Sequence, residues 1–150
     1  GTSIHNLAEL PIEIVSTGYP VLIVPFNSLK SLLEISPNFK KIKIFQKRYE
    51  CFFYACTKEP QLNSSAHARM FDPLDGIKEE SATGTAAGAL SCYLFKHNLA
   101  SDFSNLVFEQ GYSLNRPSEI KASLQLSNGK IISVNVGGAA SIVKELEINY

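Results

Sequence analysis

Short runs of apolar residues, many of them β-branched, predict strands along most of the chain. Residues 12–18 and 20–26 are rich in isoleucine and valine and flank a Gly-Tyr-Pro turn signal. The same kind of pattern predicts strands at residues 51–57, 66–71, 105–111, 119–127, 131–138 and 140–148. An Asn-Gly pair at positions 128 and 129 predicts a tight hairpin turn. We therefore expect the fold to consist mainly of short strands.

Two segments predict helices. At residues 27–35, Asn27 or Ser28 can cap a short helix, which must end before Pro37 because the residue preceding a proline avoids the helical conformation. At residues 82–96 the apolar positions fall on every side of the helical wheel, which predicts a helix that is buried all round. Many short strands and one buried helix favour an α+β fold in which the strands wrap around a central helix.

Basic residues gather at positions 40–48 and alternate there with Ile42, Ile44 and Phe45. This alternation predicts the solvent-facing side of a half-buried strand. Over the whole chain 14 basic residues balance 14 acidic ones, so the formal net charge is zero. No net field would attract nucleic acid or an anionic membrane, and we expect neither as a partner.

The length of 150 residues fits one domain. Residues 1–10 lack the features of a signal peptide and are expected to form a flexible N-terminus, with the domain at residues 11–150. No apolar run reaches the roughly 18 residues that a membrane helix needs. The cysteines Cys51, Cys56 and Cys92 are odd in number and, like the histidines, lack metal-ligand spacing. We predict reduced thiols in a cytoplasmic protein without a metal site.

The start of the long helix is rich in small polar residues. The first turn of a helix leaves up to four backbone N–H groups without partners, and Gly84 has no side chain to screen them. Thr83 and Thr85 add hydroxyl groups, so this segment can form a site for a carboxylate or a phosphate. Close packing of strands against the helix would equally explain Gly84 and Gly88. The residues alone leave both explanations open.

Several better-known sites are excluded at this segment. No Gly-Lys-Ser/Thr follows, so it is not a P-loop, and the glycine fingerprint of dinucleotide-binding proteins is absent. The acids of residues 72–80 lack the regular alternation of a calcium loop. Glu80 differs from the other acids because it comes directly before the helix start, where it could carry a proton or accept a hydrogen bond from a ligand.

Residues 68–94 resemble the second-domain signature of the phenazine-biosynthesis PhzF-like proteins. The positions that agree with this signature are Arg69, Phe71, Pro73, Gly76, Glu79, Ala82, Thr83, Gly84 and Ala86. Residues 108–120 resemble the Gln-Gly and Gly-Arg-Pro-Ser motifs of the family, and residues 134–143 resemble its closing Val-Gly-Gly motif.

The resemblance implies one lobe of a two-lobed fold shared with diaminopimelate epimerase. In that fold a curved, barrel-like, mostly antiparallel sheet wraps around one central buried helix, and we expect a short peripheral helix beside it. A small carboxylate-bearing substrate lies between the lobes, held by the helix start, so Thr83, Gly84 and Thr85 are the implied carboxylate-binding residues. Glu80 occupies the position where the family has an aspartate that assists proton transfer. The chemistry implied is isomerisation without a cofactor or a metal.

Four positions depart from the family pattern. Glu80 replaces aspartate, Ser81 replaces proline, Thr85 replaces serine and Asn115 replaces glycine. An acid is kept at position 80 and a hydroxyl at position 85, so function is not excluded. The changes nevertheless favour an altered choice of substrate or a loss of activity. The epimerases of this fold have a cysteine where this chain has Thr83. A threonine hydroxyl cannot replace a thiolate as base, which disfavours racemisation by two thiols.

The resemblance also implies a partner for this lobe. In the family the principal acid/base glutamate comes from the first lobe, which these residues do not supply. We therefore expect the first lobe of the same protein as a partner, a homodimer as a further possibility, and no isomerase turnover from this chain alone. The alternative is a non-catalytic binding or interaction domain that keeps the fold only.

Overall fold

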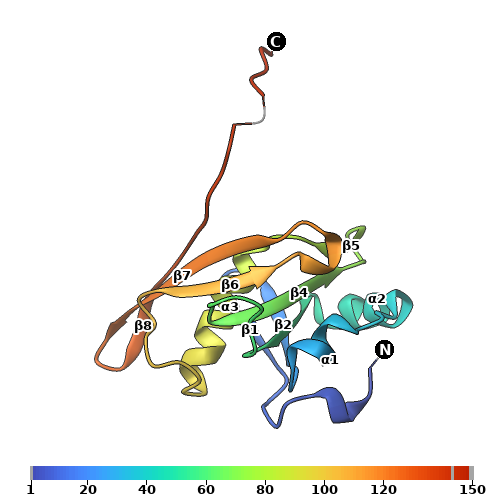
Figure 1. The fold of residues 1–150 in the computed structure, drawn as a ribbon, viewed down its shortest axis with the longest axis horizontal. Coiled ribbons are helices and arrows are strands. Elements are labelled where there is room, and N and C mark those ends of the chain that lie inside the picture. The colour runs from blue at the N-terminus through green and yellow to red at the C-terminus, as the bar shows by residue number, and fades with distance from the viewer. Residues whose placement is uncertain (1, 143, 149–150) are drawn as a thin grey trace.

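The computed structural model describes residues 2–142 and 144–148 and contains an eight-stranded sheet (Figure 1). The strands are β1 (Glu13–Ser16), β2 (Pro20–Pro25), β3 (Phe52–Thr57), β4 (Ala66–Asp72), β5 (Ile77–Glu80), β6 (Leu106–Gln110), β7 (Ser118–Ser127) and β8 (Lys130–Gly137). Their order is β1-β2-β3-β4-β6-β7-β8, with β5 paired to β4. The β2–β3 and β4–β6 pairs are parallel, and the other pairs are antiparallel.

The sheet curls around α3 (Gly84–Lys96), which contacts strands from both edges of the sheet. A Cβ atom added at Gly88 would lie 3.2 Å from the Thr17 hydroxyl, next to β1, and 3.4 Å from Val134 of β8. The two edges therefore approach one face of the same helix. Tyr54 and Phe108 are fully buried against this helix, in the main core. The expected α+β fold, a curled, mostly antiparallel sheet around one buried helix, is confirmed.

The outer face of the sheet carries a second, smaller core. Side chains alternate across a strand, so Ala55 and Phe71 point away from α3 and pack with Phe26 and Leu32. Two helices contribute to this layer, α1 (Leu29–Leu33) and α2 (Phe39–Tyr49). The first is the short peripheral helix that the sequence predicts.

The prediction of a strand at residues 40–48 is wrong, because this segment forms α2. Asn38 caps the helix by accepting a hydrogen bond from the backbone N–H of Lys41 at 3.1 Å. Phe39 and Ile42, three residues apart, pack against the outer core. Ile44, which completed the apparent alternation, is 71% exposed. The helical period of the inward-facing residues outweighs the local alternation.

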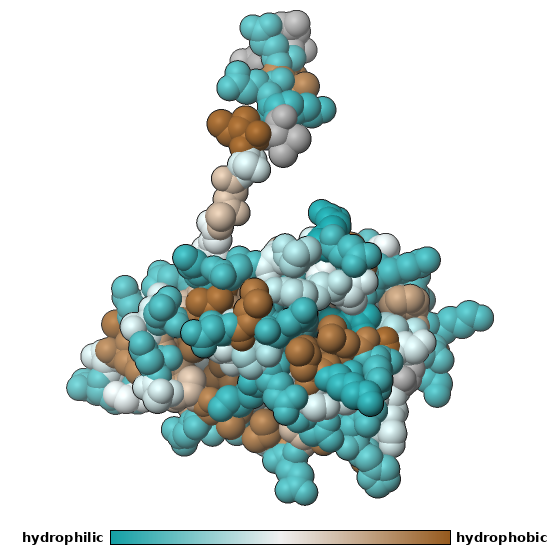
Figure 2. Space-filling model, viewed as in Figure 1, coloured by the Kyte–Doolittle hydropathy of each residue, from teal (hydrophilic) through white to brown (hydrophobic). Residues whose placement is uncertain are grey.

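The chain ends also differ from expectation. The strand predicted at residues 140–148 is wrong for the described part of this segment, which contains no strand after Gly137 and extends away from the body (Figures 1 and 2). Its alternating apolar side chains Ile142, Leu146 and Ile148 are exposed because no neighbouring strand pairs with them. Residue 143 lies outside the described residues. At the other end, Leu7 forms a bridge with Phe26, and the flexibility expected of residues 1–10 stays a prediction.

The buried carboxylate of Glu109 fastens the loop between β3 and β4. His67 Nδ1 lies 2.8 Å from Glu109 Oε2, and both side chains are almost fully buried. The Glu109 carboxylate also accepts hydrogen bonds from the backbone N–H groups of Gln61 and Leu62, each at 2.7 Å. Although burial acts to raise the pKa of Glu109, these hydrogen bonds prevail and hold it below the usual value of 4.5.

We expect acid to remove the stabilisation that Glu109 provides. Because its folded-state pKa is lowered, the contribution is complete above pH 4.5 and is lost as the pH falls through the folded-state value. The variant Glu109→Gln should reduce the free energy of unfolding by about 2 kcal/mol at pH 7, since charged hydrogen bonds to buried groups are lost. Urea unfolding of both proteins at pH 7 and pH 3 measures this, and the difference should shrink at pH 3. An equal difference at both pH values would contradict it.

Candidate functional site

The start of α3 is an open helix terminus. Thr83 is its N-cap, yet the threonine side chain makes no capping hydrogen bond. Within the part of the chain that the structure describes, the backbone N–H groups of Gly84, Thr85 and Ala86 make no hydrogen bond. Gly84 and Thr85 are exposed, and Ala86 is buried. These N–H groups, at the positive end of the helix dipole, form the geometry that binds anions in proteins.

Gly84 and Gly88 have different reasons to be glycine. A Cβ at Gly88 would make three contacts of 3.2–3.4 Å with two sheet edges, so close packing explains this glycine. A Cβ at Gly84 would meet only Val136, at 3.4 Å. That distance is at the edge of ordinary van der Waals contact, so packing alone does not demand glycine at this position. Exposure of the helix amides is the remaining explanation for Gly84.

A fully buried glutamine, Gln110, supports the segment that precedes α3. Its side-chain Nε2 donates to the carbonyl oxygen of Glu80 at 2.8 Å and to the hydroxyl of Thr83 at 3.0 Å. Its Oε1 accepts a hydrogen bond from the Tyr54 hydroxyl at 3.1 Å. Gln110 is a functional residue that the pattern of residue types did not predict. The Gln-Gly motif at positions 110 and 111 was the signal that could have identified it.

Glu80 lies at the end of β5 and is half-buried. Its Oε1 accepts a hydrogen bond from the backbone N–H of Ser81 at 2.8 Å, and the Ser81 hydroxyl is 3.4 Å from the same oxygen. The carboxylate is therefore held beside its own backbone, directly before the helix start. Within the described residues, no hydrogen bond occupies its other oxygen.

At Gly111 the backbone packs closely against Ser81, in the segment that precedes α3. Its φ of +84° is unfavourable for residues with a side chain, and its α-carbon faces the carbonyl oxygens of Arg116 and Ser81. The Ser118 hydroxyl donates to the same Ser81 carbonyl. Asn115, which stands where the family has glycine, also has a positive φ, of 53°. Asparagine tolerates this left-handed conformation better than most residues, so the turn is kept.

Two open hollows flank the helix start and share Gly84. One, of about 740 Å³, is lined by Ala82, Gly84, Pro117 and residues of β7 and β8. The other, of about 440 Å³, lies between Thr17–Tyr19, Thr85 and β8. The predicted carboxylate-binding residues Gly84 and Thr85 therefore face open space, whereas the Thr83 side chain is buried.

Two residues of the signature are structural. Arg69 and Glu79 form a bidentate ion pair, with Nε to Oε1 at 2.8 Å and Nη2 to Oε2 at 2.9 Å. Arg69 Nη1 also donates to the carbonyl oxygens of Leu32, Leu33 and Ile35, at the end of α1. The side chains of Arg69 and Glu79 are 7% and 10% exposed. This pair connects β4, β5 and α1.

The thiols and metal-ligand residues form no second candidate site. Cys51, Cys56 and Cys92 are free, and burial raises the pKa of all three thiols, that of Cys56 to about 12. A thiol with such a pKa is not a thiolate at neutral pH. Among the described residues, no group of three or more His, Cys, Asp and Glu side chains could hold a metal ion. The helices of the described residues are all too short or too polar to span a membrane.

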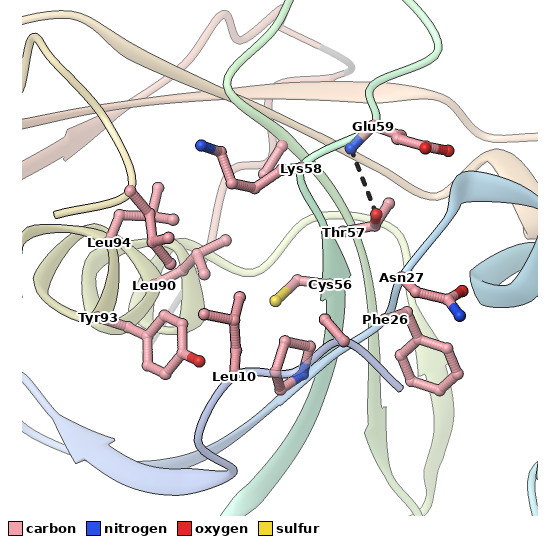
Figure 3. A pocket seen from close by; sticks show the side chains of 14 residues that line it. Leu10, Phe26, Asn27, Cys56, Thr57, Lys58, Glu59, Leu90, Tyr93 and Leu94 are labelled. Atoms are coloured by element: carbon pink, nitrogen blue, oxygen red, sulfur yellow. Dashed lines mark hydrogen bonds between the residues drawn. The ribbon is translucent and has the colours of Figure 1, made fainter. Parts of the chain in front are cut away.

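A separate pocket of about 160 Å³ lies beside the C-terminal half of α3 (Figure 3). Leu90 and Leu94 line it from the helix, Leu10 from the N-terminal segment and Cys56 from β3. Lys58 and Glu59 also lie along it, but the backbone N–H of Leu29 engages the Glu59 carboxylate at 3.0 Å. The pocket contains none of the predicted site residues.

Comparisons with known proteins agree with this fold and sequence pattern. An uncharacterized isomerase of Clostridium acetobutylicum is 32% identical over 149 residues, which are 95% of this chain and 49% of the relative. The trans-2,3-dihydro-3-hydroxyanthranilate isomerase of Pseudomonas aeruginosa is 27% identical over 139 residues, 92% of this chain and 48% of that enzyme. The chain thus spans about half the length of both proteins.

A solved structure and a family model extend the agreement to almost the whole chain. The crystal structure of a Bacillus anthracis phenazine biosynthesis protein of the PhzF family superposes with a TM-score of 0.78 at 24% identity, covering 99% of this chain and 52% of that one. The family model described as phenazine biosynthesis-like protein matches residues 1–146, including the first ten residues. The chain belongs to this family, the PhzC-PhzF family.

Proposed function

We propose that the chain is one lobe, the second, of a cofactor-independent isomerase that moves a proton next to a carboxylate. The observation that carries this proposal is the uncapped start of α3 in a member of a family that contains isomerases. The N–H groups of Gly84, Thr85 and Ala86 would hold the substrate carboxylate. A hydrogen bond to an anion in such a place is strengthened by the helix dipole and costs no rearrangement.

Glu80 is the proposed auxiliary group for proton transfer. Its position directly before the helix start would bring it next to a carboxylate bound there, and one of its oxygens accepts a hydrogen bond from the Ser81 N–H. A carboxylate held by hydrogen bonds is a suitable proton carrier if its free oxygen reaches the substrate. The activity after which two relatives are named, isomerisation of trans-2,3-dihydro-3-hydroxyanthranilate, is consistent with a substrate that carries a carboxylate.

The proposal includes a second lobe, because the hollows at the helix start are open on the side where that lobe would cover them. The apolar residues exposed on β8 and in the C-terminal segment are a surface for such a partner. Ile132 and Val136 of β8 are 65% and 42% exposed, and Ile142 is 85% exposed. Apolar residues this accessible on an edge strand are typical of a surface that another chain or lobe covers. We expect no turnover from the 150 residues alone.

The experiment removes one amide donor without disturbing the helix. Gly84 is the first residue of α3, a position where proline is well tolerated. Proline there removes only a backbone N–H group that has no partner within the helix. We expect ¹⁵N NMR titration with sodium acetate to shift the signals of Gly84, Thr85 and Ala86, with sodium chloride at equal ionic strength as the control. The variant Gly84→Pro should bind acetate more than tenfold more weakly, because one hydrogen bond to a charged group, about 1.5 kcal/mol or more, is lost. Shifts spread over the surface, or equal affinity in the variant, would contradict the proposed site.

A further inference from the structure

The N-cap of α3 behaves unlike an ordinary N-cap threonine. A threonine at this position normally accepts a hydrogen bond from the backbone N–H of the second or third helical residue, which here are Thr85 and Ala86. Thr83 has no such bond. Its hydroxyl oxygen instead accepts a hydrogen bond from Gln110 Nε2 at 3.0 Å. The capping group is therefore present but held away from the helix that it would cap.

Gln110 is fixed in this position by all of its polar atoms. Nε2 donates one proton to the Glu80 carbonyl and the other to Thr83, and Oε1 accepts from the Tyr54 hydroxyl. The side chains of Gln110 and Tyr54 are both inaccessible to solvent. Rotation of the glutamine amide would leave these buried groups unpaired, which is unfavourable for each of them. The network joins β3, β6 and the segment before α3 into one rigid support.

From this geometry we infer that Gln110 is a positioning residue that keeps the start of α3 open. By binding the Thr83 hydroxyl, it prevents that hydroxyl from occupying the N–H groups of Thr85 and Ala86. The inference deepens the proposed function and rests on it, since it names the residue that makes the helix start available to a carboxylate.

The first measurement needs no ligand. Solvent-exchange NMR on the full chain reports how exposed the Ala86 N–H group is. The variant Gln110→Met has a similar shape but cannot hold Thr83, so Thr83 is expected to turn and cap the helix. Exchange at Ala86 should slow at least tenfold in this variant and return to the original rate in the double variant Gln110→Met/Thr83→Ala. The single variant Thr83→Ala should leave the rate unchanged, because Thr83 does not cap in the original protein.

The second measurement is titration with sodium acetate. Gln110→Met should weaken acetate binding about tenfold, and removal of the Thr83 hydroxyl in the double variant should restore the affinity of the Thr83→Ala protein. General loosening of the structure would not be rescued in this way. Tyr54→Phe is the matched control: it removes one hydrogen bond of the network but leaves both Gln110 donors, so acetate affinity should stay within twofold.

The outcomes separate this inference from the proposed function. If the original protein does not bind acetate at α3, the proposed function fails, while the exchange rates at Ala86 still test the role of Gln110. Unchanged exchange in Gln110→Met, or slower exchange that persists without the Thr83 hydroxyl, would overturn the inference. If Gln110→Met does not fold, the Thr83→Ala variant decides: faster exchange at Ala86 would show that Thr83 caps the helix and that Gln110 does not divert it.

Discussion

Replacement of Gly111 by alanine is expected to lower the free energy of unfolding by about 4 kcal/mol, a loss at the upper end for single substitutions. An alanine Cβ at this position would lie 2.2 Å from the carbonyl oxygen of Arg116 and 2.9 Å from that of Ser81. Both contacts are with backbone atoms, so no side-chain rotation relieves them. The positive φ of 84° adds the strain of a left-handed residue, about 1–2 kcal/mol. The segment before α3 must therefore shift.

Gly76 provides the matched control for this substitution. Its φ of +87° is nearly the same, but nothing lies within 4 Å of the position that a Cβ would occupy. Gly76→Ala should therefore show only the backbone strain, about 1–2 kcal/mol. Chemical denaturation of both variants measures the two losses, and the difference isolates the contacts of Gly111. Equal losses in the two variants would refute the role of those contacts.

Helices and strands were predictable from the sequence where the pattern of apolar residues agrees with the side chains that are buried in the structure. The run of apolar residues on all sides of residues 82–96 predicted α3 correctly, because this helix is covered by sheet strands on several faces. The short strands β1, β2, β3 and β4 were predicted at nearly their observed positions. The strand β5 was not, since Ile77 is its single apolar residue and its pairing with β4 is interrupted by an irregularity.

The errors arise where a pattern depends on partners elsewhere in the structure. At α2 the alternation of Ile42 and Ile44 indicated a strand, but only Ile42 has a core to pack against. At residues 140–148 the alternation is present, yet no strand in the described residues pairs with it. A sequence pattern states which side chains favour burial, and the neighbouring elements decide whether burial occurs.

For the candidate site, the sequence predicted the position of the helix start. It did not predict the side-chain contacts that hold this segment in place. The helix start was predictable, and with it the unpaired amides that every helix terminus has, but the residues at positions 83–85 left anion binding and close packing both open. That Thr83 does not cap the helix depends on Gln110, which lies 27 residues further along the chain. Similarly, Arg69 and Glu79 appeared as signature residues without a role until the structure placed them in contact.

The Arg69–Glu79 pair gives the second large expected effect. Arg69→Met should reduce the free energy of unfolding by about 4 kcal/mol, because removal of one partner leaves the other charge buried and unpaired. It also removes the donor that serves the carbonyl oxygens of Leu32, Leu33 and Ile35 at the end of α1. Urea unfolding monitored by circular dichroism measures the loss.

The double variant Arg69→Met/Glu79→Leu separates the two causes. If the unpaired Glu79 carboxylate accounts for most of the loss, removal of that charge should recover stability, so the double variant should unfold at a higher urea concentration than Arg69→Met alone. The recovery is expected to be incomplete, since the α1 carbonyl groups remain without their donor. A double variant whose loss equals the sum of the single losses would mean that the two side chains stabilise the fold independently. That result would be incompatible with a bidentate pair whose side chains are 7% and 10% exposed.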